Sequence, residues 1–211
     1  MSRTALKTDS CGYWPQANKT SRVEFELAAT PLLRPLEDWR ALKFHSLAQG
    51  KQASGSGIYT VACTQCPTSE FCRASRINLA QFEMTPSQQQ KYRAFRSMVK
   101  MDIMPGALFD PDVYGLYKKY VGTRHADAKT PMADFSADDY KNTYGKNKWV
   151  VTARTDDGTL IAASIIDQHK SDFSAEYQMY DLSRAKMSPG ISMTLSLLSL
   201  MREMEPNGNM Y

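Results

Sequence analysis

The spacing of hydrophobic and polar residues predicts short strands and one helix in the first part of the chain. Val23–Leu27 alternates apolar and polar side chains, which indicates a strand, and Ile58–Ala62 is a second β-type run. Apolar residues recur at roughly helical spacing over Leu36–Leu47. Gln49–Gly57 is rich in glycine and serine, so we predict a loop there.

The middle of the chain is predicted to be mainly helical. Arg76–Phe82 carries a strand pattern. A helix is predicted to run from Gln88 to Lys100, because Thr85 or Ser87 would cap its start and proline is tolerated in a first turn. Two further helices are predicted over Pro111–Tyr120 and Ser136–Tyr144.

The last third of the chain has a different pattern. Three strands are predicted, over Lys148–Arg154, Leu160–Ile166 and Ser174–Tyr180. Asp157-Gly158 is a turn signal, so the first two strands form a hairpin. An apolar helix follows over Ile191–Met204. This order of strands and helix predicts an α+β fold on a largely antiparallel sheet.

Composition and charge narrow the class of protein. The chain has 211 residues, 42% of them hydrophobic, and a net charge of +4, which is ordinary for a soluble globular protein. No apolar run reaches the roughly 18 residues that a transmembrane helix needs. The N-terminal residues contain no apolar stretch typical of a secretory signal. We therefore expect a cytoplasmic protein.

The four cysteines indicate a candidate metal centre. Cys63, Cys66 and Cys72 form a Cys-x-x-Cys-x5-Cys pattern, and Cys11 lies far upstream. Cytoplasmic thiols stay reduced, and four thiolates suit either Zn or an iron–sulfur cluster. The alternative is that these thiols are core residues without a ligand.

A basic stretch is a candidate nucleic-acid contact. Between residues 73 and 100 the only acidic residue is Glu83. The basic residues are Arg73, Arg76, Lys91, Arg93, Arg96 and Lys100. The last three would share a face of a helix that extends to residue 100. A cluster of positively charged residues suits binding to a phosphate backbone, but a helix face that only contacts solvent would have the same sequence.

Several motifs occur in the order typical of one family. Cys11-Gly12-Tyr13-Trp14-Pro15 resembles a Cys-x-Tyr-x-Pro turn, and Ser188-Pro189-Gly190 resembles a Ser-Leu-Gly that opens a helix. The most specific match is Leu116-Tyr117-x-x-Tyr120-x-x-x-Arg124-His125, which is similar to LYxxYxxxRH. On these residues the chain resembles the aminoacyl-tRNA–protein transferases, which are arginyltransferase and its bacterial leucyltransferase relatives.

The resemblance implies a fold and a reaction. The fold would be a GNAT-like (acyltransferase) mixed sheet with flanking helices, preceded by a small cysteine-containing region. The expected domains are residues 1–100 and 101–211, the second shortened relative to relatives. The donor would be an aminoacyl-tRNA carrying arginine or leucine. The acceptor would be the N-terminal α-amine of a protein beginning with Asp or Glu, which is thereby marked for degradation. No membrane or DNA partner is implied.

The resemblance also implies roles for individual residues. Arg124 would bind an anionic group, either the acceptor carboxylate or a tRNA phosphate. His125 would orient this site or move a proton. Tyr180 and Asp181 would line the pocket, with Asp181 contacting the α-amine. The metal or cluster, held by the four cysteines, would organise the N-terminal region or report redox state.

The helix start at Ser188 and Gly190 is a candidate anion site, because backbone N–H groups and the helix dipole point out of it. The resemblance implies that it faces the 3′ end of the tRNA.

Two other functions stay open. One is a GNAT acyltransferase that uses acyl-CoA, although a glycine-rich pyrophosphate loop is absent from the sequence at this turn. The other is a non-catalytic tRNA-binding module with a metal or cluster.

Overall fold

The computed structural model describes residues 5–10, 18–26, 36–54, 57–61, 74–124, 135–145 and 148–211. The chain divides into two compact units, Met1–Arg76 with Tyr211, and Ile77–Met210. The sequence predicts a boundary after residue 100, whereas the second unit of the structure begins at Ile77. Residues 77–100 join the second unit because the helix that they contain packs against its C-terminal helix.

The described part of the first unit contains a four-stranded antiparallel sheet in the order β1-β2-β4-β3 and one helix. Its elements are β1 (Ala5–Ser10), β2 (Asn18–Glu26), α1 (Leu36–Ala48), β3 (Gln52–Ser54) and β4 (Gly57–Val61). The strands predicted at residues 23–27 and 58–62 and the helix at 36–47 are confirmed. The predicted loop at 49–57 is wrong in part, because β3 pairs with the start of β4 as a short hairpin.

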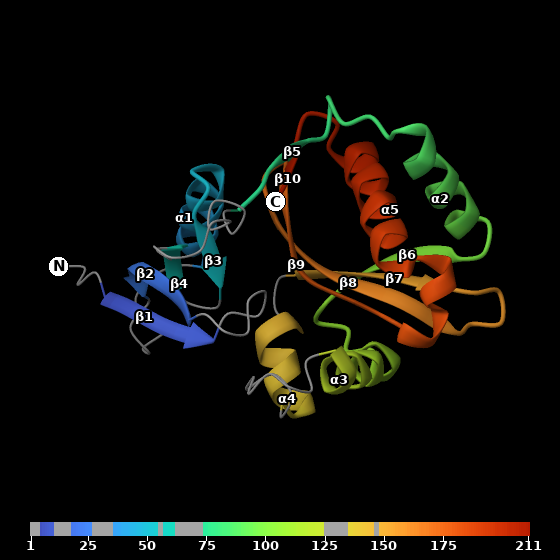
Figure 1. The fold of residues 1–211 in the computed structure, drawn as a ribbon, viewed down its shortest axis with the longest axis horizontal. Coiled ribbons are helices and arrows are strands. Elements are labelled where there is room, and N and C mark those ends of the chain that lie inside the picture. The colour runs from blue at the N-terminus through green and yellow to red at the C-terminus, as the bar shows by residue number, and fades with distance from the viewer. Residues whose placement is uncertain are drawn as a thin grey trace. The chain divides into compact units, whose positions relative to one another are not determined.

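The second unit is built on a mixed sheet, which within the described residues has six strands in the order β5-β10-β9-β8-β7-β6 (Figure 1). Its strands are β5 (Ile77–Asn78), β6 (Lys100–Pro105), β7 (Lys148–Arg154), β8 (Leu160–His169), β9 (Asp172–Tyr180) and β10 (Asn209–Met210). Neighbouring strands are antiparallel except for β10 and β9, which are parallel. The predicted α+β class is confirmed.

Helices cover both faces of this sheet (Figure 1). They are α2 (Pro86–Arg96), α3 (Pro111–Arg124), α4 (Ala137–Tyr140) and α5 (Pro189–Met204), with a π-helical turn at Lys141–Gly145 and a 3-10 helix at Leu182–Met187. Side chains of β8 alternate between the two faces: Ile166 packs with Met193 of α5, and Ile165 packs with Tyr117 of α3. The sheet therefore has a hydrophobic core on each side.

Helix α2 begins as the sequence predicts but ends earlier. Thr85 and Gln88 form a capping box: the Gln88 N–H donates to Thr85 Oγ1 at 3.3 Å, and the Thr85 N–H donates to Gln88 Oε1 at 2.8 Å. The helix stops after Arg96, where Ser97 is the C-cap. Lys100 therefore starts β6, and the prediction that it continues the basic helix face is wrong. The buried Val99 turns the chain into the sheet because it packs in the core.

Replacing Thr85 with alanine is expected to lower the free energy of unfolding by about 1 kcal/mol, because the capping box loses its side-chain acceptor. Urea denaturation followed by circular dichroism would measure this change. Ser87→Ala is the matched control, since Ser87 is exposed and takes no part in the cap. Equal midpoints for the two variants would contradict the assigned cap.

Three other predictions differ from the structure in detail. The strand predicted at residues 76–82 is limited to Ile77–Asn78, because Leu79 leaves the strand and is fully buried. Strands β6 and β10 were not predicted. The helix predicted from Ile191 begins at Pro189. No helix among the described residues is long and apolar enough to cross a bilayer.

Candidate functional site

Helix α3 forms one wall of the candidate site, and charged groups fix its start against the sheet. The Asp112 N–H donates to Asp110 Oδ1 at 2.8 Å, which satisfies a free amide of the first turn. Arg154 on β7 donates to Asp110 Oδ2 at 2.8 Å and to Asp112 Oδ2 at 2.9 Å. A planar guanidinium that binds two carboxylates holds the helix in one orientation.

Tyrosines fill the layer between α3 and the sheet. The ring of Tyr117 lies 5.5 Å from that of Tyr177 on β9 and 5.1 Å from that of Tyr140, measured between centroids. Burial raises the pKa of both Tyr117 and Tyr177 to about 12. Their hydroxyls therefore stay protonated near neutral pH, so these two residues shape the wall of the site and do not act as bases.

Tyr120 connects two of the predicted site residues. Its ring makes an edge-to-face contact with that of Tyr180, with centroids 5.0 Å apart. Burial raises the pKa of Tyr120, a hydrogen bond with Tyr180 adds to this effect, and the positive charge of Arg124 opposes it. Arg124 is the last residue of α3 and is exposed. Tyr120 thus contacts Tyr180 and is influenced by the charge of Arg124.

Asp181 is held rigidly just after β9. Its N–H donates to the carbonyl of Ile161, and its Oδ1 accepts from the Ser183 N–H at 3.0 Å and the Ser183 hydroxyl at 2.8 Å. Lys119 of α3 adds an ion pair to Oδ1 at 3.2 Å. Partial burial opposes ionisation of Asp181, but the donors from Ser183 and Lys119 outweigh it and hold the pKa of this carboxyl below its usual value.

The start of α5 is packed closely against Tyr180. A Cβ on Gly190 would lie 3.0 Å from Tyr180 Cε1, so only glycine allows this approach without a shift. Gln178 on β9 donates to the carbonyl of Gly190 at 2.9 Å and accepts from Thr194 at 3.2 Å. Ser188 has a left-handed backbone with φ of 48° and makes no side-chain cap. The helix start is therefore fixed by β9.

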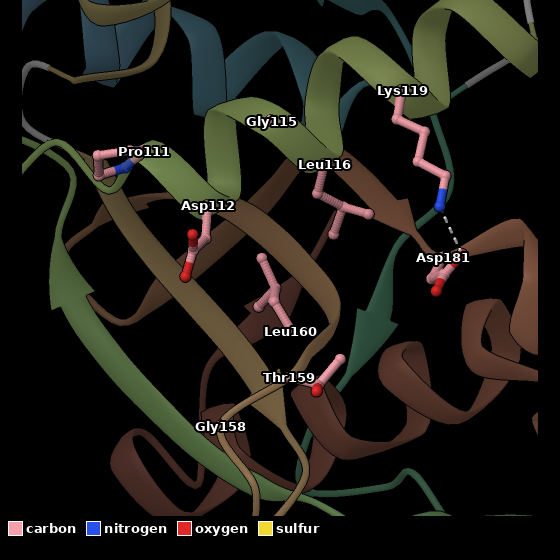
Figure 2. Close-up of a pocket in the computed structure, with 9 residues that line it drawn as sticks. All are labelled: Pro111, Asp112, Gly115, Leu116, Lys119, Gly158, Thr159, Leu160 and Asp181. Carbon is pink, nitrogen blue, oxygen red and sulfur yellow. Dashed lines mark hydrogen bonds and ion pairs between the residues drawn. The ribbon is translucent and has the colours of Figure 1, made fainter.

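An open cavity of about 420 Å³ lies between α3, the β7–β8 turn and Asp181 (Figure 2). The charged side chains at its lining are Asp112, Lys119 and Asp181. Asp112 is paired with Arg154, whereas Lys119 reaches across to Asp181. Figure 2 shows this Lys119–Asp181 pair at one end of the cavity and Asp112 near the other. The cavity can therefore bind a ligand that carries both a positive and a negative group.

At the end of β9, Tyr180 contacts Tyr120 of α3 and lies against Gly190 of α5, and Asp181 follows it in the chain. Arg124 lies one turn beyond Tyr120 on α3, and Ser188 is the residue before α5. The proposed metal ligands, together with His125 and Arg73, lie outside the described residues. Within the described ranges, no three His, Cys, Asp or Glu side chains are grouped to hold a metal ion.

The remaining basic residues of the predicted patch lie before β5, on α2 and on β6. Lys91, Arg93 and Arg96 are exposed on α2, and Arg76 is exposed before β5. Lys100 pairs with Asp156 at 3.0 Å. Helix α2 covers the face of the sheet opposite to α3 (Figure 1).

Sequence reasoning missed Gln178 and Thr194, and it offered Lys119 only as an extension of the basic patch. Lys119 meets Asp181 across 62 positions of sequence, and the two polar residues around Gly190 come from a strand and the following helix. One signal pointed to Lys119, namely its place between Tyr117 and Tyr120 in the motif on α3.

Fold and site together define an α+β protein with a charged cavity and a tightly fixed helix start at one end of a mixed sheet. A solved structure with a similar fold is described as the structure of L-PGS from Bacillus licheniformis. It aligns with a TM-score of 0.52 over 64% of this chain and 42% of that chain, at 14% identity. This likeness concerns the fold alone.

The sequence comparisons show which proteins the chain is similar to. Residues 112–210 match the family model described as "Arginine-tRNA-protein transferase, C terminus". An aspartate/glutamate leucyltransferase of Ruegeria sp. (strain TM1040) is 28% identical over 159 residues, which are 74% of this chain and 56% of that relative. One of Pseudomonas fluorescens (strain Pf0-1) is 28% identical over 191 residues, 88% of this chain and 74% of that relative. These matches support a relationship to the aminoacyl-tRNA–protein transferases.

Proposed function

We propose that this chain transfers an amino acid from an aminoacyl-tRNA to the N-terminal α-amine of a protein that begins with Asp or Glu. The observation that supports the proposal is the contact of Tyr180 with Tyr120 and with Gly190, next to Asp181 and inside the segment that matches the family model. The names of the relatives favour leucine over arginine as the transferred residue. We interpret the sheet and its helices as the GNAT-like arrangement.

The reaction makes an amide from an ester. The nitrogen of the α-amine attacks the carbonyl carbon that joins the amino acid to the tRNA. A C–N bond forms, the bond to the ribose oxygen breaks, and this oxygen takes the proton that the amine loses and becomes the free hydroxyl of the tRNA. Because the ester is already activated, the protein has mainly to position the two substrates and stabilise the developing charge.

Each residue of the site has a role in this scheme. Asp181 accepts a hydrogen bond from the α-amine and orients it. The start of α5, fixed by Gln178 and Gly190, points amide donors and the positive end of its dipole toward the 3′ end of the tRNA. Arg124 binds an anionic group, either the acceptor carboxylate or a tRNA phosphate. The four cysteines stay a predicted site for Zn or an iron–sulfur cluster, and no step of this scheme depends on it.

The rate of transfer is expected to rise with pH up to about 8, because the α-amine, whose pKa is near 8, must lose its proton to attack. The lowered pKa of Asp181 keeps it ionised throughout this range and makes it too weak a base to take that proton. Single-turnover rates between about pH 5.5 and 9 would measure the profile. A rate that is independent of pH over this range would contradict attack by the free amine.

The direct test is a transfer assay with the purified chain. The chain is incubated without oxygen with charged tRNA pools and with peptides that begin with Asp, Glu or Ala, and the peptide mass is followed. A mass gain on the acidic peptides alone supports the proposal, and its size identifies the amino acid.

Two other outcomes would contradict the proposal and favour a different function. Retention of tRNA without any product would favour a non-catalytic tRNA-binding module. Acyl transfer from an acyl-CoA, with no response to charged tRNA, would favour a CoA-dependent acyltransferase.

A further inference from the structure

We infer that Lys119 determines the preference for an acidic acceptor, by binding the side-chain carboxylate of the N-terminal residue while Asp181 holds its α-amine. This inference rests on the proposed function and names a residue that no motif assigns. The cavity between α3 and the β7–β8 turn would then hold the first residue of the acceptor, and Arg124 would be left for the tRNA.

The hydrogen bonds of Asp181 leave one of its oxygens available. The Ser183 N–H, the Ser183 hydroxyl and Lys119 all donate to Oδ1. Oδ2 accepts from none of the residues that the structure describes. A carboxylate held by its own backbone turn, with a second oxygen open, is a fixed acceptor for a ligand amine.

Lys119 is the more exposed member of the ion pair. Its side chain is 61% exposed, whereas that of Asp181 is 15% exposed. An exposed pair of this kind contributes little to stability, so separating it costs little. Lysine also carries its charge on a flexible stem that can turn toward a new partner. Lys119 can therefore release Asp181 when a ligand offers another carboxylate.

An N-terminal Asp or Glu brings both charges that this exchange needs. Its ammonium or amine would face Asp181 Oδ2, and its side-chain carboxylate would face Lys119 Nζ. The pair in the free protein is thus replaced by two pairs in the complex. An Asn or Gln in the same place would leave the charge of Lys119 without an anion. A site that pairs with a charged group of the substrate rejects an analogue without that group.

The lining of the cavity separates the two cations at the end of α3. Lys119 borders the cavity with Asp112, Leu116, Thr159 and Asp181. Arg124 lies further along α3, near Tyr120, and does not line this cavity. We therefore assign the acceptor carboxylate to Lys119 and a tRNA phosphate to Arg124.

The test compares transfer to two peptides that differ only in their first residue, Asp or Asn. Lys119→Ala is expected to raise KM for the Asp peptide about tenfold, to leave kcat unchanged and to abolish the preference for Asp over Asn. Lys119→Arg should restore the preference. Arg124→Ala should instead raise KM for the charged tRNA. Lys141→Ala is the matched control, because Lys141 is another exposed lysine paired with an aspartate, Asp138, at 3.4 Å.

An unchanged peptide KM and a retained preference in Lys119→Ala would overturn the inference while the proposed function stands. If the wild-type chain transfers nothing, the proposed function fails, and peptide binding still decides the role of Lys119. For this purpose a fluorescently labelled Asp peptide is titrated with the wild-type chain and with Lys119→Ala. Binding that depends on Lys119 supports the inference, and equal binding or no binding overturns it.

Discussion

Asp181→Asn is expected to lower kcat/KM for amino-acid transfer about a hundredfold without unfolding the site. The asparagine keeps an oxygen that can accept from Ser183, so the 3-10 helix at Leu182–Met187 keeps its cap. What is lost is the negative charge that orients the α-amine and pairs with Lys119. Steady-state kinetics with an Asp peptide would measure the change.

A matched variant separates this effect from a general change in charge. Asp138→Asn removes an aspartate that is also paired with a lysine, but one that is exposed on α4, away from the cavity lining. It should transfer at the wild-type rate. Equal activity of Asp181→Asn and Asp138→Asn would exclude a role for Asp181 in binding the amine.

Gly208→Ala is expected to lower the free energy of unfolding by about 3 kcal/mol, the largest stability effect that we predict for a single methyl group. An added Cβ would collide with the carbonyl oxygen of Ser171. Both sides of this contact are backbone, so the turn after α5 has to move. Gly208 also accepts from the Leu79 N–H at 3.0 Å, and this hydrogen bond would be disturbed.

Gly122→Ala is the control for Gly208→Ala, and its expected effect has the opposite sign. Gly122 lies in α3, and a Cβ there would meet no atom within 4 Å. Alanine in a helix is favoured over glycine by about 1 kcal/mol, so this variant should be slightly more stable than the wild type. Urea unfolding of both variants would measure the difference. A Gly208→Ala midpoint equal to that of the wild type would contradict the close approach to Ser171.

The sequence predicted most elements of the second unit, because their hydrophobic spacing reflects burial on one or both faces. The prediction was wrong where the same spacing of residues is compatible with both a helix and a strand. Arg93, Arg96 and Lys100 fit a helical face, yet Val99 is buried in the sheet core and ends the helix before Lys100. The two-residue β10 is too short to leave any periodicity, and its existence depends on partners far away in sequence.

The sequence allows candidate site residues to be named only where they lie in a recognisable motif. Arg124, Tyr180, Asp181 and Gly190 stand in short recognisable stretches, and the structure brings these stretches together. Lys119 and Gln178 could not be assigned, since a polar residue acquires its role from a partner across the fold. For Lys119 that partner is Asp181, which reaches α3 only after the sheet has formed.

The position of β10 has a consequence for the order in which the second unit forms. Asn209 and Met210 pair with Asn78 and Ile77 on one side, and Met210 pairs with Phe173 on the other. The β7–β8 and β8–β9 hairpins are local in sequence and can form early, whereas β5 has to wait for residues 209–210 to be synthesised. The strand that opens the second unit is therefore the last one to be joined to its sheet.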